Sequence, residues 1–218
     1  MYLHHIIEII DMAKIITLAQ QKGGATKTTT SMNLAGALME AGYTVRVADL
    51  NREQRSATKW AGRGDIFKSI VVSISDKQPR KDIIELSKVA DWIIIDTPPE
   101  LTTPAFKAAL LSDLLIIPCL PSPLDLEAAE ETVDLAEAAG KNFRLLASNV
   151  RAKTSIGKQL PETLKRLGST FKTTIHQKVS IVEAAMVGEW IGSYEPNSDA
   201  HSEYKALLAE ILAIKELF

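Results

Sequence analysis

Residues 15–36, IITLAQQKGGATKTTTSMNLAG, contain the pattern that decides the fold. An apolar stretch leads into two adjacent glycines, Gly23 and Gly24, and a run with helical composition follows them. The glycines let the backbone turn sharply with its N–H groups pointing inward, and a helix N-terminus adds partial positive charge. A strand, a glycine-rich turn and a helix in this order predict a phosphate-binding loop.

This loop departs from the pattern G-x-x-x-x-G-K-[ST] at two positions. Gln21 and Thr26 stand where glycines are usual, while Lys27 and Thr28 match the lysine and the hydroxyl. Such a lysine reaches the β and γ phosphates, and the hydroxyl binds magnesium. A β-branched residue at position 26 must adopt a conformation that glycine adopts freely, so we expect Thr26 to narrow the loop or weaken nucleotide binding. The predicted nucleotide-binding residues of the loop are Gly23, Gly24, Ala25, Thr26, Lys27, Thr28 and Thr29.

The rest of the chain alternates between short apolar stretches and helical patterns. The stretches at 15–19, 45–48, 70–73, 92–95, 114–118 and 145–148 do not alternate with polar residues, which is typical of strands buried on both faces. Helical patterns are found at 27–41, 80–89, 104–111, 126–139, 156–167, 182–186 and 200–217. This order predicts an α/β fold of the P-loop NTPase type, a mainly parallel twisted sheet with helices on both faces. Ligands of such sheets bind at the carboxyl ends of the strands.

Length, charge and cysteine content limit the remaining possibilities. The chain has 218 residues, which suits a single domain over 1–218, and a net charge of -2, which gives no global attraction to polyanions. Cys119 is the one cysteine, so we expect no disulfide framework and a small buried residue in a strand. Residues 1–12 either form an N-terminal extension before a start at Met12 or pack on the sheet edge. They lack the features of a signal peptide.

Five stretches of the chain resemble the ParA/MinD family of ATPases, whose Walker A loop carries a second lysine. They are KGGATKTTT at 22–30, DLNREQRSATKW at 49–60, WIIIDTPPE at 92–100, LLIIPCLPSPLDLEAA at 114–129 and EAAMVGEWIGSYEPNSDAHSEYKALLAEI at 183–211. The set is most similar to the small ParA proteins of plasmid partition and cargo positioning. The resemblance implies ATP and Mg²⁺ as cofactors and an ATP-dependent homodimer. Lys22 matches the family's signature lysine, which reaches the partner's nucleotide across that dimer.

Two strand ends carry the predicted catalytic and metal-binding groups. Asp96 ends a buried strand, where a carboxylate can hold a magnesium-bound water beside Thr28. Asp49 matches the family's first aspartate, and Asn51 falls where its second aspartate positions or activates the attacking water. Asparagine is uncharged and takes no proton, so we expect slow ATP hydrolysis catalysed by Lys22, Lys27, Asp49 and Asn51. Takeover by Asp49 or Glu53 and an engineered asparagine both stay open.

The family also places adenine recognition at four positions near the C-terminal part of the sheet. By resemblance, Asn149 and Arg151 follow the sixth strand and recognise the base, and Pro196 and Ser198 lie in a loop that closes over it. Ordinary polar loop residues are the alternative interpretation. His176 is expected to have a surface or capping role rather than to bind a ligand.

Positive charge gathers in one segment. Nine basic residues lie between Lys141 and Lys178, against Glu162 alone, which gives a local net charge of +8. Such a segment either binds phosphate backbones without reading sequence or is a solvated face. Because ParA proteins bind nucleoid DNA as ATP dimers, the resemblance favours DNA. The predicted DNA-binding residues are Lys153, Lys158, Lys165, Arg166, Lys172 and Lys178.

These observations together predict a cytoplasmic, nucleoid-associated ParA-like ATPase. Its ATP dimer would bind non-specific DNA, and a ParB-like or other cargo adaptor protein would stimulate hydrolysis. One alternative is a slow or non-hydrolysing nucleotide-binding scaffold. The other is a MinD-like membrane-positioning ATPase, which the acidic balance of the C-terminal helix disfavours: Glu203, Glu210 and Glu216 against Lys205 and Lys215.

Overall fold

The computed structural model describes residues 13–51, 53–75, 77–99, 106 and 109–217. Within them seven strands form one sheet in the order β3-β2-β4-β1-β5-β6-β7, and every neighbouring pair is parallel. The predicted parallel α/β sheet is therefore confirmed. Residues 1–12, whose role was left open, lie outside the described residues, and so does half of the predicted helix at 104–111, namely residues 104, 105, 107 and 108.

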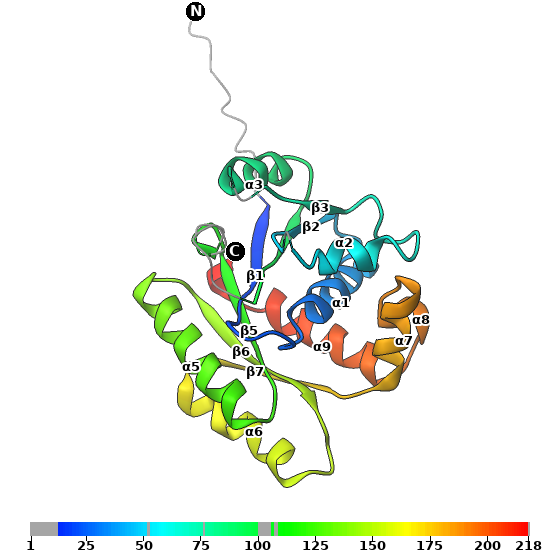
Figure 1. The fold of residues 1–218 in the computed structure, drawn as a ribbon. Coiled ribbons are helices and arrows are strands. Elements are labelled where there is room, and N and C mark those ends of the chain that lie inside the picture. Colours follow the sequence, from blue (N-terminus) through cyan, green and yellow to red (C-terminus); the bar gives the residue numbers. More distant parts are fainter. Residues whose placement is uncertain (1–12, 52, 76, 100–105, 107–108, 218) are drawn as a thin grey trace, which may run out of the picture.

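The helices and strands follow one another along the chain as Figure 1 labels them. The strands are β1 (Lys14–Leu18), β2 (Val45–Asp49), β3 (Val71–Ser73), β4 (Trp92–Asp96), β5 (Leu114–Cys119), β6 (Phe143–Val150) and β7 (Thr170–His176). The helices are α1 (Lys27–Glu40), α2 (Ser56–Ala61), α3 (Pro79–Ser87), α5 (Pro123–Ala138), α6 (Ser155–Leu167), α7 (Val179–Val187), α8 (Ile191–Tyr194), α9 (Asp199–Leu212) and the 3₁₀ turn η1 (Lys215–Leu217).

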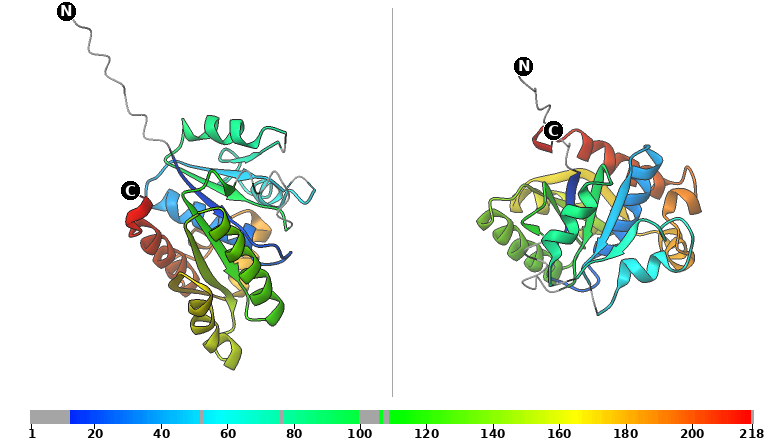
Figure 2. Two further views of the ribbon diagram at one scale, coloured as in Figure 1. Left: turned by 90° about the vertical axis from the view of Figure 1, so that its left-hand side faces the viewer. Right: turned by 90° about the horizontal axis from the view of Figure 1, so that it is seen from above.

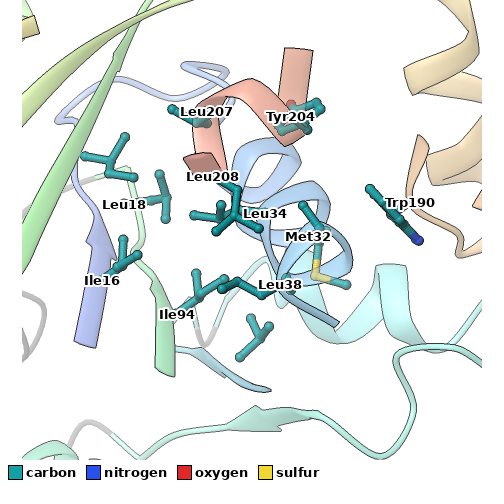
Figure 3. Packing of buried hydrophobic residues seen from close by; sticks show 14 of the residues in the cluster. Ile16, Leu18, Met32, Leu34, Leu38, Ile94, Trp190, Tyr204, Leu207 and Leu208 are labelled. Atoms are coloured by element: carbon teal, nitrogen blue, oxygen red, sulfur yellow. The ribbon is translucent and has the colours of Figure 1, made fainter. Parts of the chain in front are cut away.

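Helices cover both faces of the sheet, because successive strand residues point to opposite sides. In β1, Ile16 and Leu18 pack with α1 and α9, while Ile15 packs on the other face with residues near α3. Helices α5 and α6 cover the same face as α3 farther along the sheet, so α5 and α9 lie on opposite sides (Figure 2). Figure 3 shows strand side chains meeting leucines of α1 and α9. This packing fixes α1, and with it the loop that begins it.

The side chain of Trp190 packs between α8 and α1. A Cβ built on Gly36 of α1 would lie 2.2 Å from Cγ of Trp190, and one built on Gly192 would lie equally close to the far end of the ring. The imidazole of His201 meets the ring edge-on, with the ring centroids 5.1 Å apart. Trp190 is buried at one end of the cluster in Figure 3. The two glycines therefore provide the space that this ring occupies.

Strand β7 was not predicted, because much of its sequence, TFKTTIH, is polar. Among the described residues it pairs only with β6, so one of its edges has no neighbouring strand there. Carboxylates of α9 bind that edge. Glu210 accepts hydrogen bonds from the backbone N–H groups of Lys172 at 2.8 Å and Thr173 at 2.7 Å, and Glu203 accepts one from His176 at 2.9 Å.

Helix α9 ends at Leu212 rather than continuing to 217 as predicted, and a short 3₁₀ turn follows it. The short helices α2 and α8 were also missing from the prediction. Cys119 is buried at the end of β5, as predicted. In the part of the chain that the structure describes, no helix has both the length and the apolar character needed to cross a membrane.

Candidate functional site

The predicted phosphate-binding loop connects β1 to α1 at the carboxyl edge of the sheet. Lys27 is buried there, and its ammonium donates hydrogen bonds to the carbonyl oxygens of Gln20 at 2.9 Å and Lys22 at 3.0 Å. Burial lowers the pKa of Lys27 to about 8, and the nearby Asp96 opposes that shift. The Lys27 side chain thus lies against its own loop, and its buried positive charge favours the binding of an anion beside it.

Thr26 takes the conformation that its position was expected to require. Its backbone lies in the left-handed region, with φ 61° and ψ 16°. For a residue with a Cβ this conformation costs on the order of 1–2 kcal/mol. Its hydroxyl is 2.7 Å from the hydroxyl of Ser148 in β6, and this hydrogen bond offsets part of the cost. The bond also holds the end of β6 against the loop.

Asp96 and Thr28 lie side by side, as predicted from their positions. The Thr28 hydroxyl donates to Asp96 Oδ2 at 2.7 Å, and Ser31 donates to Oδ1 at 3.3 Å. Burial raises the pKa of Asp96 to about 7, the Thr28 hydrogen bond lowers it, and the charge of Asp49 raises it further. A hydroxyl and a carboxylate are hard oxygen ligands that fit Mg²⁺, which takes one or two carboxylates beside substrate phosphates. The described residues contain no cluster of three or more metal-binding side chains, which a protein-only site would need.

Asp49 holds the segment that follows β2. Its Oδ2 accepts hydrogen bonds from the backbone N–H of Thr58 at 2.8 Å and the Thr58 hydroxyl at 2.7 Å, and its Oδ1 accepts from the N–H of Asn51 at 3.0 Å. All three donors belong to the segment that follows β2. Asp49 therefore positions the N-terminal turn of α2 relative to the sheet.

The side chain of Asn51 closes a local turn. Its Oδ1 accepts from the backbone N–H of Gln54 at 3.0 Å, and its Nδ2 donates to Gln54 Oε1 at 3.3 Å. The residue is buried but faces the cavity described next. It brings a neutral amide to the site.

A cavity of about 510 Å³ opens beside the loop, a volume typical of small-ligand sites. All seven predicted loop residues, Gly23 to Thr29, line it, together with Asn51. The other described lining residues are Gln54, Ser56, Lys59, Trp60, Arg63, Thr97, Pro99 and Ala185. The structure thus brings the phosphate loop and the position after β2 around one space.

The four predicted adenine-binding residues do not line this cavity. The Arg151 side chain donates to Gln177 Oε1 at 2.6 Å, and the Ser198 hydroxyl caps α9 by accepting from the N–H of His201 at 3.2 Å. Pro196 is exposed, and Asn149 has φ 53° near the end of β6. Since Asn149 follows Ser148, it does lie near the loop. The role of these residues in base recognition stays a prediction.

Lys22 contacts its own chain. Its ammonium lies 2.7 Å from Asp125 Oδ2, and Asp125 is buried in the first turn of α5, where the Ser122 hydroxyl also bonds it. This pair was not predicted, because the residues are 103 positions apart. Lys59, Trp60 and Arg63 were not predicted either, because they lie within or close to a stretch of family resemblance but carry no motif of their own.

The predicted DNA-binding residues lie on α6, on β7 and in the adjoining loops, and all but Lys178 are exposed. Two of them have acidic partners: Lys165 lies 2.6 Å from Glu162, and Lys178 lies 3.1 Å from Asp199. Helix α9 also brings Glu203 and Glu210 next to β7. The charge of this surface is therefore less one-sided than the segment's sequence indicates, and DNA binding stays a prediction.

His176 lies 2.7 Å from Glu203 through its Nδ1. This contact ties β7 to α9.

Comparisons with known proteins agree with this geometry. A family model described as an AAA domain matches residues 13–90. Maintenance of carboxysome distribution protein A of Gloeobacter kilaueensis is 30% identical over 209 residues, which cover 91% of this chain and 94% of that protein. Sporulation initiation inhibitor protein Soj of Bacillus subtilis is 27% identical over 252 residues, covering 93% and 99%. The solved septum site-determining protein MinD of Pyrococcus horikoshii, complexed with Mg-ADP, has the same fold with a TM-score of 0.77 at 20% identity, covering 94% and 99%.

Proposed function

The chain belongs to the ParA/MinD family of P-loop ATPases, and from this premise we propose that it binds ATP with Mg²⁺ and hydrolyses it to position or segregate a plasmid or another cargo. The observation that carries the proposal is the Thr28–Asp96 pair beside the buried ammonium of Lys27, at the rim of a cavity lined by the phosphate loop. The relative from Pyrococcus horikoshii, solved with Mg-ADP, supports the same cofactors here.

Each group in the site has a distinct task. The loop N–H groups and Lys27 bind the phosphates, and Thr28 and Asp96 hold the metal. When bound there, Mg²⁺ would neutralise negative charge on the phosphates. Asp49 keeps the segment carrying Asn51 in place through its three hydrogen bonds. Asn51 orients the attacking water but takes no proton from it, so hydrolysis is slow.

ATP joins two copies of the chain in this proposal. Lys22 leaves Asp125 and reaches the nucleotide bound by the partner subunit. The open cavity beside the loop has room for more than a triphosphate chain. Asp125 remains stabilised after Lys22 leaves, because it lies in the first turn of α5 and bonds Ser122.

The dimer then binds DNA without reading sequence, through exposed basic side chains of α6 and its surroundings. The predicted set is Lys153, Lys158, Lys165, Arg166, Lys172 and Lys178. A ParB-like or other cargo adaptor stimulates hydrolysis and releases the protein from the nucleoid within the cytoplasm. A gradient of bound dimers positions the cargo.

A second candidate is a nucleotide-binding scaffold that hydrolyses ATP slowly or not at all. It is favoured by the neutral amide of Asn51 and by the strained Thr26. Multiple-turnover phosphate release separates it from an ATPase. A MinD-like membrane positioner is not favoured, because the apolar residues of α9, among them Leu207, Leu208 and Ile211, are buried in the core.

The test is fluorescence anisotropy with non-specific duplex DNA, in the presence of ATP, ADP or no nucleotide, at two salt concentrations. We expect tight, salt-sensitive binding only with ATP. Lys158→Ala should weaken it, whereas Lys81→Ala on α3 removes the same charge and should not. Absence of DNA binding under all three nucleotide conditions would refute the DNA-positioning function.

A further inference from the structure

The cavity beside the phosphate loop contains two cationic side chains besides Lys27. Lys59 comes from α2, and Arg63 follows the end of that helix. Among the described residues that line the cavity, none carries a carboxylate. Positive charges that share a cavity repel each other, and an anionic ligand relieves that repulsion. The cavity therefore has more positive charge than a loop lysine alone provides.

Three hydrogen bonds fix the helix that carries these cations. Thr58 bonds Asp49 as described, the Trp60 indole N–H donates to the carbonyl of Glu189 at 3.0 Å, and Arg63 Nη1 donates to the carbonyl of Ala185 at 2.8 Å. They tie α2 to β2 at one end and to α7 and the residues after it at the other. The backbone at Lys59 is therefore held in place before any ligand binds, whereas its exposed side chain is free to reach a ligand.

Lys59 remains available for a ligand. Its ammonium makes no hydrogen bond or ion pair with any residue that the structure describes. Lys68, which follows α2 farther along the chain, differs in this respect, because its ammonium lies 2.7 Å from a carboxylate oxygen of Asp65. Arg63 uses one N–H for Ala185 and has four more. The two cations that face the cavity thus keep donors free.

Asn51 adds no negative charge to this cavity. It lines the same cavity as Lys59 and Arg63. A carboxylate at position 51 would attract these cations, whereas the amide leaves their charge uncompensated. With a neutral amide at position 51, the described lining of the cavity contains positive but no negative side chains.

We propose that Lys59, assisted by Arg63, binds the terminal phosphate of the nucleotide from within the same chain. The inference rests on the proposed nucleotide-binding function. It makes the site distinguish triphosphate from diphosphate. It also places positive charge where negative charge is redistributed over the terminal phosphate during transfer.

The test is calorimetric titration with Mg-ADP and with a non-hydrolysable Mg-ATP analogue. Lys59→Met keeps the aliphatic length and removes the charge. We expect it to weaken binding of the ATP analogue by about tenfold, the order of magnitude of one charged hydrogen bond, and to change ADP binding by less than about twofold. Lys59→Arg should restore the preference, and Arg63→Gln should show the same selective loss.

The matched control is Lys68→Met, which removes a charge outside the cavity and should leave both affinities unchanged. Thermal unfolding confirms that the variants fold. If Lys59→Met weakens binding of both nucleotides equally, or of neither, the proposed role of Lys59 is refuted. Nucleotide binding by the wild type would in that case still support the proposed function. If the wild-type protein binds neither nucleotide, both the proposed function and the role of Lys59 are refuted.

Discussion

Replacing Gly36 by alanine should destabilise the fold through Trp190. The new Cβ would lie 2.2 Å from Cγ and 2.3 Å from Cδ2 of the ring, far inside van der Waals contact. The ring has little room to retreat, because Gly192 approaches its far end and His201 meets it edge-on. A shift of about 1 Å in a packed aromatic ring would therefore have to move α8 or α1.

The magnitude follows from two opposing effects. Overpacking a buried site costs about 1–3 kcal/mol, and the rigid ring puts this site at the upper end. Alanine in a helix interior recovers about 1 kcal/mol relative to glycine. The net loss is then about 2 kcal/mol, or about 4–8 °C in melting temperature for a chain of this size.

Urea denaturation followed by circular dichroism measures this loss. Gly62→Ala is the control, because a Cβ there meets only carbonyl oxygens at 3.5 Å and beyond, and its stability should change little. Trp190→Leu should cost stability alone but little more when combined with Gly36→Ala, since the smaller side chain removes the clash. If Gly36→Ala is as stable as the wild type, the described packing of Trp190 is wrong.

Three further predictions concern the site. Asn51→Asp should raise steady-state phosphate release by tenfold or more, because a carboxylate can take a proton from the attacking water; an unchanged rate at equal ATP affinity would refute the assigned role. Affinity for the Mg-nucleotide, measured by calorimetry, should rise from pH 6 to pH 8. Below its pKa of about 7, the Asp96 carboxyl holds a proton that the metal must displace. Removing Mg²⁺ with EDTA should abolish this pH dependence, and a flat profile with Mg²⁺ would contradict the prediction. Thr26→Gly should be about 1 kcal/mol more stable in urea than Thr26→Ala, since φ is 61°, and the opposite order would show that the strain is absent.

The sequence predicted six of the seven strands: the edge strand β3, which is only partly buried, and five that are mostly buried, namely β1, β2, β4, β5 and β6. Their apolar residues pack on both faces, and this burial leaves an uninterrupted apolar pattern. Strand β7 lacks that pattern, since Lys172 and Thr173 lie at an edge where α9 carboxylates replace a neighbouring strand. No local pattern indicates such a tertiary contact.

The same distinction applies to the site. Thr28 and Asp96 were predicted as neighbours, because parallel strands bring their carboxyl ends to one edge and the loop has a known geometry. The placement of α2, which carries Lys59, is supported by the bond from Trp60 to Glu189, which spans 129 positions. The pairing of Lys22 with Asp125 spans 103 positions. Contacts of this range follow from the packed fold and leave no trace in residue spacing.

The carboxylates along β7 have a consequence for assembly. An unpaired strand edge normally offers N–H groups that can recruit a strand from another molecule, which is a route to fibres and aggregates. Here Glu203 and Glu210 already accept the N–H groups of three residues on that edge. Two copies therefore cannot merge their sheets through β7 without giving up these bonds. Strand-to-strand association of this protein is therefore disfavoured at the β7 edge of the sheet.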